Sequence, residues 1–341
     1  MFSNFKIFLS VKRVLLLTAL ILAISQLQAR TIFVKKGANG NGSSWDQALG
    51  SVQEALLRAK SGDVIWVALG KYFTTKDSDR TKSFVIPDGV KMYGGFAGYE
   101  SSPEQRDALK HLTILSGEIG QPAKDDNAYT VVYTKNASNA TVVDGFVIMG
   151  GSAAGSASQN PLHHKGAGWF NDATNGNSSP SIRNCIFMDN IAREGAGMYN
   201  YASNGVCMPS IENCKFIRNI SEVDGGAVFN DGNNGKCIPQ ITNCLFEGNE
   251  ATYGAGMFNK ADFGQAVPNV RNCVFVANIA YIRGSGVYND RTASSKGVCD
   301  AIMTSCRFEN NSSSVGNEIS SRVSNFDFHQ GGLEAKSSAG Y

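Results

Sequence analysis

The stretch that decides the fold reads Pro180-Ser181-Ile182-Arg183-Asn184-Cys185-Ile186-Phe187-Met188-Asp189-Asn190 and continues, four residues later, as Gly195-Ala196-Gly197-Met198-Tyr199-Asn200. The same order of residue types returns three more times, and a reduced fifth copy ends at Asn311. The steps between the cysteines of successive copies are 29, 30, 29 and 33 residues, counted through Cys185, Cys214, Cys244, Cys273 and Cys306. A fixed period in this range indicates a solenoid, in which each repeat buries its apolar face against its neighbours.

The repeats predict short strands rather than helices, because Gly, Asn and Pro interrupt every apolar run and no run has helical spacing. Ile182 and Cys185 lie three residues apart, so a straight strand cannot point both inward. A bend at Asn184 can, since Asn tolerates the left-handed backbone conformation. The same residue returns in each copy, as Asn184, Asn213, Asn243 and Asn272. We expect these side chains to form a column in which each amide can hydrogen-bond the next.

A repeat of about 29 residues with two or three short strands matches one coil of a parallel β-helix, with a rise of about 4.8 Å per coil. In that fold one apolar residue of each coil forms an interior stack: Phe187, Phe216, Phe246, Phe275 and Phe308. The five cysteines of the repeat are expected to form the stack beside it. The predicted fold class is therefore all-β, and the clearest coils lie within residues 166–311.

Two signatures carry a resemblance to a known family. Phe-x-x-Asn recurs from Phe187 to Asn190 and in the next three copies, and Gly-Gly-Ala-Val spans Gly225 to Val228. Together they resemble the polymorphic outer-membrane-protein repeat, over roughly half of the chain, although most copies read Gly-Ala-Gly or Gly-Ser-Gly. The resemblance implies the single-stranded right-handed parallel β-helix of the pectin-lyase-like superfamily. It also implies surface or secreted adhesins in the family itself, and polysaccharide lyases and hydrolases in the wider superfamily, so it indicates fold rather than activity.

The chain begins with a predicted export signal over residues 1–29, because a basic front precedes an apolar run from Val14 to Ile24. The alternative is an uncleaved anchor. Residues 30–110 are interpreted as an N-terminal cap and first coils, 111–325 as the β-helix and 326–341 as a tail. The net charge of +2 favours neither nucleic acid nor a membrane surface. We expect a secreted, cell-surface or periplasmic protein with no membrane span after signal cleavage; the oligomeric state is left open.

One α-helix is predicted, over residues 51–60, where Ser51 and Glu54 have the spacing of a capping box. Its apolar residues recur at intervals of three and four, which gives one buried stripe. Such a helix would cover the open end of the first coil, where strand edges and core are otherwise exposed. A partner-binding helix is the alternative.

Eight cysteines in an exported chain normally suggest disulfides. The repeat register argues against bridges for the five ladder cysteines, because parallel in-register strands point their Cβ atoms the same way. We expect buried free thiols that pack as small hydrophobes. A bridge from Cys207 to Cys237, or from Cys207, Cys237 or Cys299 to the ladder cysteine seven residues on, stays open. No metal site is expected, and His163-His164 is interpreted as an exposed loop pair rather than as a metal or acid–base pair.

Two columns of side chains flank the glycine turn of each repeat. The residue before the turn forms the first column: Lys165, Glu194, Asp224, Tyr253 and Arg283. The residue after the repeat Asn forms the second: Asp172, Tyr201, Asp231, Lys260 and Asp290. Charges and aromatic rings in a row suit an extended glycan, and they also suit ordinary solvated loops. Asp172 and Asp231 would lie roughly 9.6 Å apart from strand spacing, near the upper end of the roughly 6.5–9.5 Å that inverting glycosidases use.

Two functions follow as hypotheses. The first is an exported, non-catalytic β-helix that serves as an adhesin or glycan-binding scaffold, with a polysaccharide or host-cell-surface glycan as its partner. The second is a polysaccharide lyase or glycoside hydrolase that uses one face of the helix. No cofactor is expected, and calcium would be needed only if the chain were a lyase. No confident catalytic residue is assigned.

Overall fold

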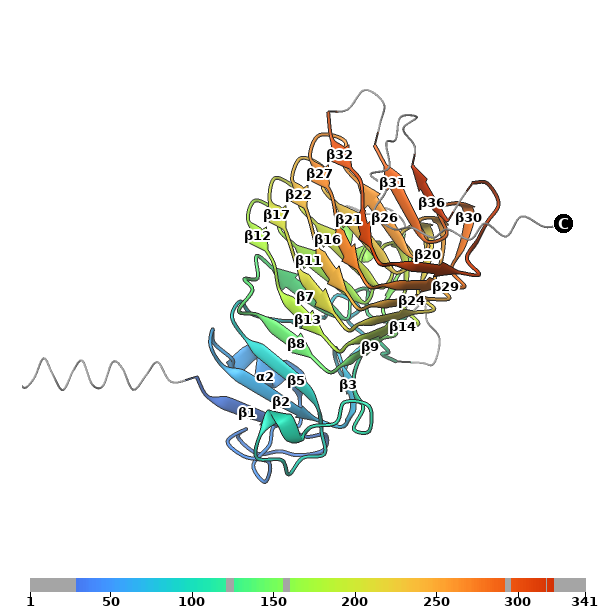
Figure 1. Ribbon diagram of the computed structural model, residues 1–341. Helices are drawn as coiled ribbons and strands as arrows, with labels where there is room; N and C mark the ends of the chain where they lie inside the picture. The colour runs from blue at the N-terminus through green and yellow to red at the C-terminus, as the bar shows by residue number, and fades with distance from the viewer. Residues whose placement is uncertain (1–28, 121–125, 156–159, 292–295, 317, 322–341) are drawn as a thin grey trace, which may run out of the picture.

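The computed structural model describes residues 29–120, 126–155, 160–291, 296–316 and 318–321 and shows a right-handed parallel β-helix (Figure 1). The predicted fold class is confirmed. The predicted leader, residues 1–29, lies outside the described residues except for Ala29, and the predicted tail, residues 326–341, lies wholly outside them. In the described part of the chain, no helix combines the length and apolar character that a bilayer-crossing segment needs.

Five parallel sheets run along the axis. Sheet A contains β1 (Thr31–Val34), β2 (Val64–Ala68), β5 (Lys91–Phe96), β8 (Val142–Asp144), β13 (Ser181–Arg183), β18 (Ser210–Glu212), β23 (Gln240–Thr242), β28 (Asn269–Arg271) and β33 (Ile302–Thr304). Sheet B contains β3 (Gly70–Phe73), β6 (Thr113–Ser116), β9 (Val147–Met149), β14 (Ile186–Met188), β19 (Lys215–Ile217), β24 (Leu245–Glu247), β29 (Val274–Val276) and β34 (Arg307–Glu309).

The other three sheets complete each coil. Sheet C contains β4 (Phe84–Val85), β7 (Val132–Lys135), β11 (Trp169–Asp172), β16 (Met198–Tyr201), β21 (Val228–Asp231), β26 (Met257–Lys260), β31 (Val287–Asp290) and β36 (Ile319–Ser321). Sheet D contains β10 (Ser152–Ala153), β15 (Ile191–Glu194), β20 (Ile220–Asp224), β25 (Glu250–Tyr253), β30 (Ile279–Arg283) and β35 (Ser312–Ser313). Sheet E contains β12 (Asn177–Ser178), β17 (Val206–Cys207), β22 (Lys236–Cys237), β27 (Gln265–Ala266) and β32 (Val298–Cys299).

The bend between sheets A and B is made by the repeat asparagine. Asn184, Asn213, Asn243 and Asn272 all have φ between 51° and 56°, and Ser305 has φ of 53° in the fifth copy. This left-handed residue turns the chain so that Ile182 and Cys185 both point into the core, where neither is exposed. Within the described residues, amide bonding along this asparagine column is limited to Asn213 Nδ2, which donates to Asn184 Oδ1 at 3.5 Å.

The phenylalanines of the repeat stack inside sheet B. Phe187 pairs in register with Phe216, and the series continues through Phe246 and Phe275 to Phe308. Successive ring centroids are 4.7, 5.1, 4.4 and 4.9 Å apart, and the rings are within 10° of parallel. This spacing equals the strand spacing, so each ring shields the next from water.

Two further asparagine series form continuous amide ladders in the core. The first joins Asn190, Asn219, Asn249, Asn278 and Asn311, and each Nδ2 donates to the next Oδ1 at 2.9–3.0 Å. The second joins Asn171, Asn200, Asn230, Asn259 and Asn289 at 2.8–3.2 Å. Because a buried amide is costly unless it is bonded, every coil depends on its neighbours for these contacts.

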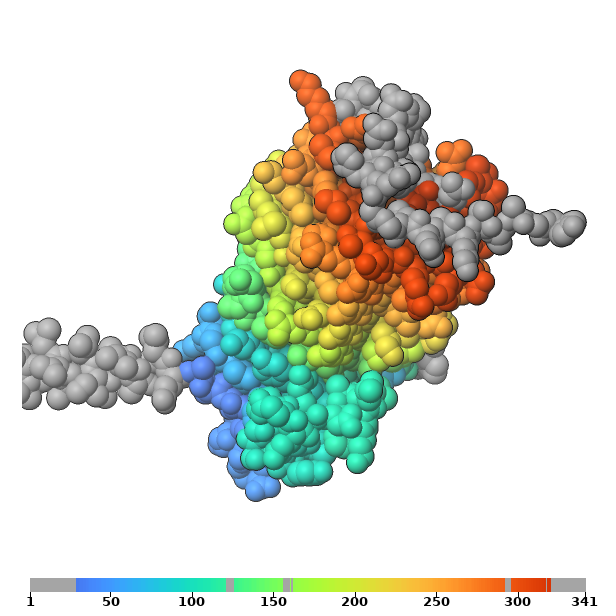
Figure 2. Space-filling model, viewed as in Figure 1, coloured from blue at the N-terminus to red at the C-terminus, as the bar shows by residue number. Residues whose placement is uncertain are grey.

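The predicted helix is α2 (Val52–Arg58), and its N-cap Ser51 accepts a hydrogen bond from the Glu54 amide. Val52, Ala55 and Leu56 are buried in the main core, so α2 covers the first coils as expected. Two short 3₁₀ helices, η1 (Pro103–Gln105) and η2 (Pro161–His163), lie in loops. In the space-filling view the N-terminal coils, blue to cyan, form the lower end, and the repeat coils stack above them (Figure 2).

Candidate functional site

An aromatic row lies at the corner where sheet D turns into sheet C. Its members are Phe170, Tyr199, Phe229, Phe258 and Tyr288, and each is at most 5 % exposed. They occupy the opposite face of each strand from the core residues such as Met198 and form a cluster separate from the main core. Successive ring centroids are 4.6–5.5 Å apart.

The glycine turn makes room for this row. An added Cβ at Gly195 would lie 2.8 Å from Tyr199 Cδ2 and 3.0 Å from Phe229 Cβ. Gly195 also has φ of 63°, a conformation that favours glycine. The chain therefore folds tightly against its own outward aromatic rings. The residues on either side of the turn, which are the two predicted columns, are thereby held beside the row.

The structure places all five residues of the first column in register. Lys165 bridges to Glu194, and the pairs Glu194–Asp224, Asp224–Tyr253 and Tyr253–Arg283 follow along sheet D. The second column is also in register, through the pairs Asp172–Tyr201, Tyr201–Asp231, Asp231–Lys260 and Lys260–Asp290. Both columns therefore follow the helix axis.

Lys165 links the two columns through the aromatic row. Its Nζ lies 3.2 Å from Glu194 Oε2 and donates a hydrogen bond of 3.0 Å to the Tyr199 hydroxyl. The Tyr199 hydroxyl in turn donates to Asp231 Oδ2 at 2.7 Å. Nζ also lies 4.9 Å and 5.9 Å from the ring centroids of Tyr199 and Tyr201. We call Lys165, Glu194, Tyr199, Asp224 and Asp231 the Lys165 cluster.

Asp224 has the most informative electrostatics in this cluster. Burial, followed by the negative charge of Glu194, raises its pKa from 3.8 to about 7, although Lys260 opposes the change. Burial also raises the pKa of Asp231, and the hydrogen bond from Tyr199 partly offsets that effect. At neutral pH the cluster therefore contains a carboxyl group that is near its midpoint, with the charge of Glu194 favouring its protonated form and that of Lys260 favouring its ionised form.

The tyrosine hydroxyls explain how the carboxylates of the second column are held. Tyr133 donates to Asp172 Oδ2 at 2.8 Å, just as Tyr199 donates to Asp231. Each tyrosine belongs to the coil before the aspartate that it contacts. Sequence reasoning missed both tyrosines, although an aromatic residue recurs there in every copy and could have pointed to them. Asp172 and Asp231 therefore serve as acceptors in separate pairs.

The upper residues of the first column are less connected. The Tyr253 ring lies 5.2 Å from that of Tyr288, at the edge of the aromatic row. Arg283 is exposed, and in the described part of the chain its side chain makes no hydrogen bond or ion pair. The structure thus brings Lys165, Glu194 and Asp224 together with Asp231, and leaves Tyr253 and Arg283 as a continuation along the axis.

The interpretation of His163-His164 as exposed loop residues is wrong. His164 is 8 % exposed, and burial followed by the charge of Lys165 lowers its pKa. The His163 ring stacks on Tyr129 at 4.3 Å, with Arg80 on Tyr129 at 4.2 Å. Stacking on Tyr129 and burial of His164 hold this part of the chain in place, which a count of flanking Gly, Ala and Ser residues does not reveal.

All eight cysteines are free thiols, and seven are buried. The thiol of Cys214, for example, donates to the Glu212 carbonyl at 3.3 Å. Cys207 and Cys237 are paired in register across neighbouring parallel strands and remain unbridged. In the described ranges of the chain, no group of three or more His, Cys, Asp or Glu side chains has an arrangement that could hold a metal ion.

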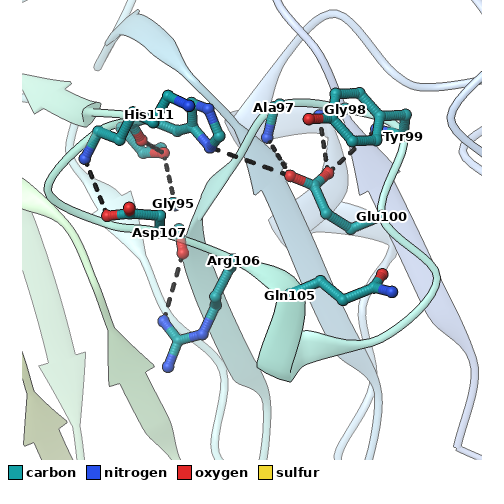
Figure 3. Close-up of polar contacts among 12 residues, drawn as sticks. Gly95, Ala97, Gly98, Tyr99, Glu100, Gln105, Arg106, Asp107 and His111 are labelled. Carbon is teal, nitrogen blue, oxygen red and sulfur yellow. Dashed lines mark hydrogen bonds and ion pairs between the residues drawn. The ribbon is translucent and has the colours of Figure 1, made fainter.

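A second polar cluster lies in the loop after β5 (Figure 3). The Glu100 carboxylate accepts hydrogen bonds from the amides of Ala97, Gly98 and Tyr99 at 2.5–3.0 Å, and His111 Nδ1 lies 4.0 Å away. Burial alone would raise the pKa of Glu100, but these amides outweigh it and the pKa falls below its ordinary value. Arg106 pairs with Asp144 at 2.9 Å. These contacts fix the loop to the first coils.

Comparison with known proteins adds the following. No family model and no curated protein matches the chain, so the resemblance to the polymorphic outer-membrane-protein repeat stays a prediction. Among solved structures, pectate lyase Pel9A is similar at 12 % identity over 85 % of this chain and 79 % of its own, with a TM-score of 0.46. A deglycosylated pectin methylesterase from Aspergillus niger is similar at 14 % identity over 88 % of this chain and 94 % of its own, with a TM-score of 0.34. Likeness at this level does not extend to activity.

Proposed function

We propose that this chain is an exported, non-catalytic β-helix protein, secreted or at the cell surface, that binds an extended glycan along the two columns. The observation that carries the proposal is the register: both columns and the aromatic row repeat once per coil along one axis. A ligand whose own units repeat along a chain can contact one coil after another along this axis, whereas a compact ligand reaches only a few coils.

The chemistry of the columns suits a hydroxyl-rich ligand. In the second column donors alternate with acceptors, since Tyr201 and Lys260 lie between aspartates. The first column contains both kinds of group without alternating: Lys165, Tyr253 and Arg283 can donate, and Glu194 and Asp224 can accept. Lys165 is already paired with Glu194, so the cluster does not present a field of one sign. Tyr201 and Tyr253 remain half-buried beside the aromatic row and offer ring faces on which a sugar can pack.

A glycoside hydrolase or polysaccharide lyase is the second candidate, and Asp224 favours it. A general acid works best when its pKa lies near the operating pH, and the pKa of Asp224 is raised to about 7. Lys165 and Asp231, which is buried, are linked through Tyr199 in the same cluster. In this reading Asp224 donates the proton to the leaving group, and Glu194 is the charged carboxylate beside it.

One experiment separates the two candidates. The purified chain is incubated with a panel of neutral and acidic polysaccharides, and both binding and the release of reducing or unsaturated ends are measured. If the chain is a non-catalytic scaffold, we expect it to bind a polysaccharide without releasing reducing or unsaturated ends. Arg283→Ala and Tyr253→Ala should weaken binding about ten-fold, whereas Arg271→Ala, an exposed arginine on sheet A, should leave it within about two-fold.

Release of chain ends at an enzymatic rate would overturn the scaffold proposal, provided that Asp224→Asn abolishes it and Glu247→Gln, an exposed carboxylate on sheet B, does not. Binding that none of the column variants changes would show that the ligand lies on another face of the coils. A loss of binding in Arg283→Ala is distinguishable from a folding defect, because Arg283 is exposed and its replacement removes no core contact.

A further inference from the structure

A groove of about 1310 Å³ lies at the N-terminal end, far along the axis from the upper coils. It runs between α2, the loop at residues 36–40 and the edge strands β3 and β4. Figure 1 shows α2 and β3 at this end of the chain. Gln53 of α2 fixes its floor, because Gln53 Nε2 donates to the carbonyls of Thr74 and Ser83 at 2.5 and 3.0 Å. The groove is thus built from four separate segments that packing holds together.

The groove is strongly basic. Its lining contains five basic side chains and one acidic side chain, while the whole chain has a net charge of only +2. Lys71 pairs with Glu118, Lys82 with Asp79 at 3.4 Å, and Arg58 with Glu54. Two cations are left over: within the described residues, Lys36 and Lys76 have no ion-pair partner within 4 Å, and both are exposed. The local field therefore attracts an anion.

Apolar side chains stand among these lysines. In β3 the alternation of the strand buries Tyr72 and turns Lys71 and Phe73 outward, so Phe73 is 42 % exposed. Val85 of β4 is 53 % exposed for the same reason. Lys71 Nζ lies 5.6 Å from the Phe73 ring centroid. An exposed ring between cations is suited to a ligand that has both an apolar face and negative groups.

Polar groups in the groove point to hydroxyl partners. Thr74 lines the groove and is 1 % exposed, yet its Oγ1 has no hydrogen-bond partner in the described part of the chain. Ser51, Thr75 and Asn39 add further donors and acceptors to the lining. The buried Thr74 hydroxyl is not accessible to a ligand, but Asn39 is exposed and Thr75 is half-buried, so both can hydrogen-bond a ligand hydroxyl.

We propose that this groove binds a segment of an acidic polysaccharide, with its carboxylate or sulfate groups on Lys36 and Lys76 and a sugar face on Phe73. The volume exceeds the roughly 300–1,000 Å³ of sites for single small molecules, which favours a stretch of polymer. The concave shape of the groove argues against a flat anionic membrane as the ligand. This site goes beyond the glycan face proposed above, because it shares no residue with the two columns.

The test uses the purified chain and four probes at low ionic strength: a glucuronic-acid oligosaccharide, the neutral glucose oligosaccharide of equal length, its sulfated form, and vesicles that contain an anionic lipid. We expect either acidic oligosaccharide to bind at least ten-fold more tightly than the neutral one, and salt to weaken that binding. The two acidic arms distinguish carboxylate from sulfate recognition.

Two double variants locate the site. Lys36→Glu with Lys76→Glu should weaken acidic binding about ten-fold or more, and Phe73→Ala should weaken it several-fold. Lys215→Glu with Lys236→Glu makes the same change in net charge at exposed positions on sheets B and E, and it should change binding less than two-fold. Arg283→Ala should also leave it unchanged, which separates this site from the glycan face.

Three outcomes would overturn the proposal. The neutral oligosaccharide could bind as tightly as the acidic ones, the Lys215 and Lys236 control could lose as much affinity as the groove variant, or the vesicles could bind while both acidic oligosaccharides do not. Circular dichroism of each variant confirms that the fold is kept, and all four replaced lysines are exposed, so unfolding does not mimic a loss of binding.

Discussion

The inside and the outside of the same coils follow different rules. Inside sheet B, five successive coils present the same residue, Phe187 through Phe308, and the rings stack at 4.4–5.1 Å. In the first column outside, five successive coils, beginning one coil before that of Phe187, present Lys165, Glu194, Asp224, Tyr253 and Arg283. Close packing demands one shape at each interior level. The side chains of the first column lie outside this close-packed main core. The residue type at these positions can therefore differ from coil to coil while the backbone of the coil stays the same.

The interior stack gives the largest predicted effect. Phe246→Ala removes a fully buried ring between Phe216 and Phe275 and leaves a cavity that the neighbouring coils cannot fill. We expect a loss of about 3–5 kcal/mol in the free energy of unfolding. Urea unfolding followed by circular dichroism measures it.

The matched control is Phe263→Ala in a loop of the same coil, where the ring is 70 % exposed. Its replacement should cost no more than about 0.5 kcal/mol. Equal losses at the two positions would contradict the contrast between interior and exterior, and they would mean that the Phe246 stack contributes little.

Two asparagines of one coil, Asn249 and Asn243, allow the same comparison between a buried and a less buried position for a single residue type. Asn249 lies in the buried ladder, where its Oδ1 accepts from the Asn219 amide and Nδ2 and its Nδ2 donates to Asn278. Asn249→Ala leaves those groups unpaired, and we expect it to cost about 2–4 kcal/mol. Asn243 instead supplies only the bend, with φ of 56°. Asn243→Gly should therefore stay within about 1 kcal/mol of the native chain.

Thermal unfolding of the two variants side by side tests this difference. Should Asn243→Gly prove as harmful as Asn249→Ala, the repeat asparagine at the bend would have to contribute more than its backbone conformation. Should both be harmless, the amide ladders would not contribute to the coupling between coils.

The interior could be predicted because its signals are periodic. The 29- and 30-residue steps locate Phe216 and Phe246 on one axis, and the three-residue gap from Ile182 to Cys185 requires the bend found at Asn184. The boundaries of the first coils were harder: β3 was missed, because Gly70-Lys71-Tyr72-Phe73 has no partner repeat to mark it. Where the chain does not repeat, strands can be predicted only from the β-propensity of the residues, and β-propensity is a weak predictor.

The site could be predicted only in part. Register alone places the two columns, since it needs no side-chain detail. The Lys165 cluster depends on the direction of side chains, for example the reach of Tyr199 to Asp231 in the next coil, and periodicity does not specify that. The basic groove depends on four segments that meet only in the folded chain, with Lys36 and Lys76 forty residues apart.

The smallest predicted effect concerns Asp224 and its dependence on pH. Because the folded chain raises the pKa of this carboxyl from 3.8 to about 7, the folded state binds its proton more tightly than the unfolded state. The resulting stabilisation is fully present below pH 4 and is lost as the pH rises toward 7. Asp224→Asn removes the titrating group, so above pH 7 the variant should gain stability relative to the native chain by on the order of 1 kcal/mol.

Unfolding midpoints of both proteins between pH 5 and pH 8 measure this gain, with Glu247→Gln as a control for the change in net charge at an exposed position. The informative quantity is the difference between Asp224→Asn and the native chain at each pH. A difference that does not grow with pH would mean that water or Lys260 compensates the buried charge. Asp224 would then stay ionised at neutral pH, and the argument for a general acid at this corner would fail with it.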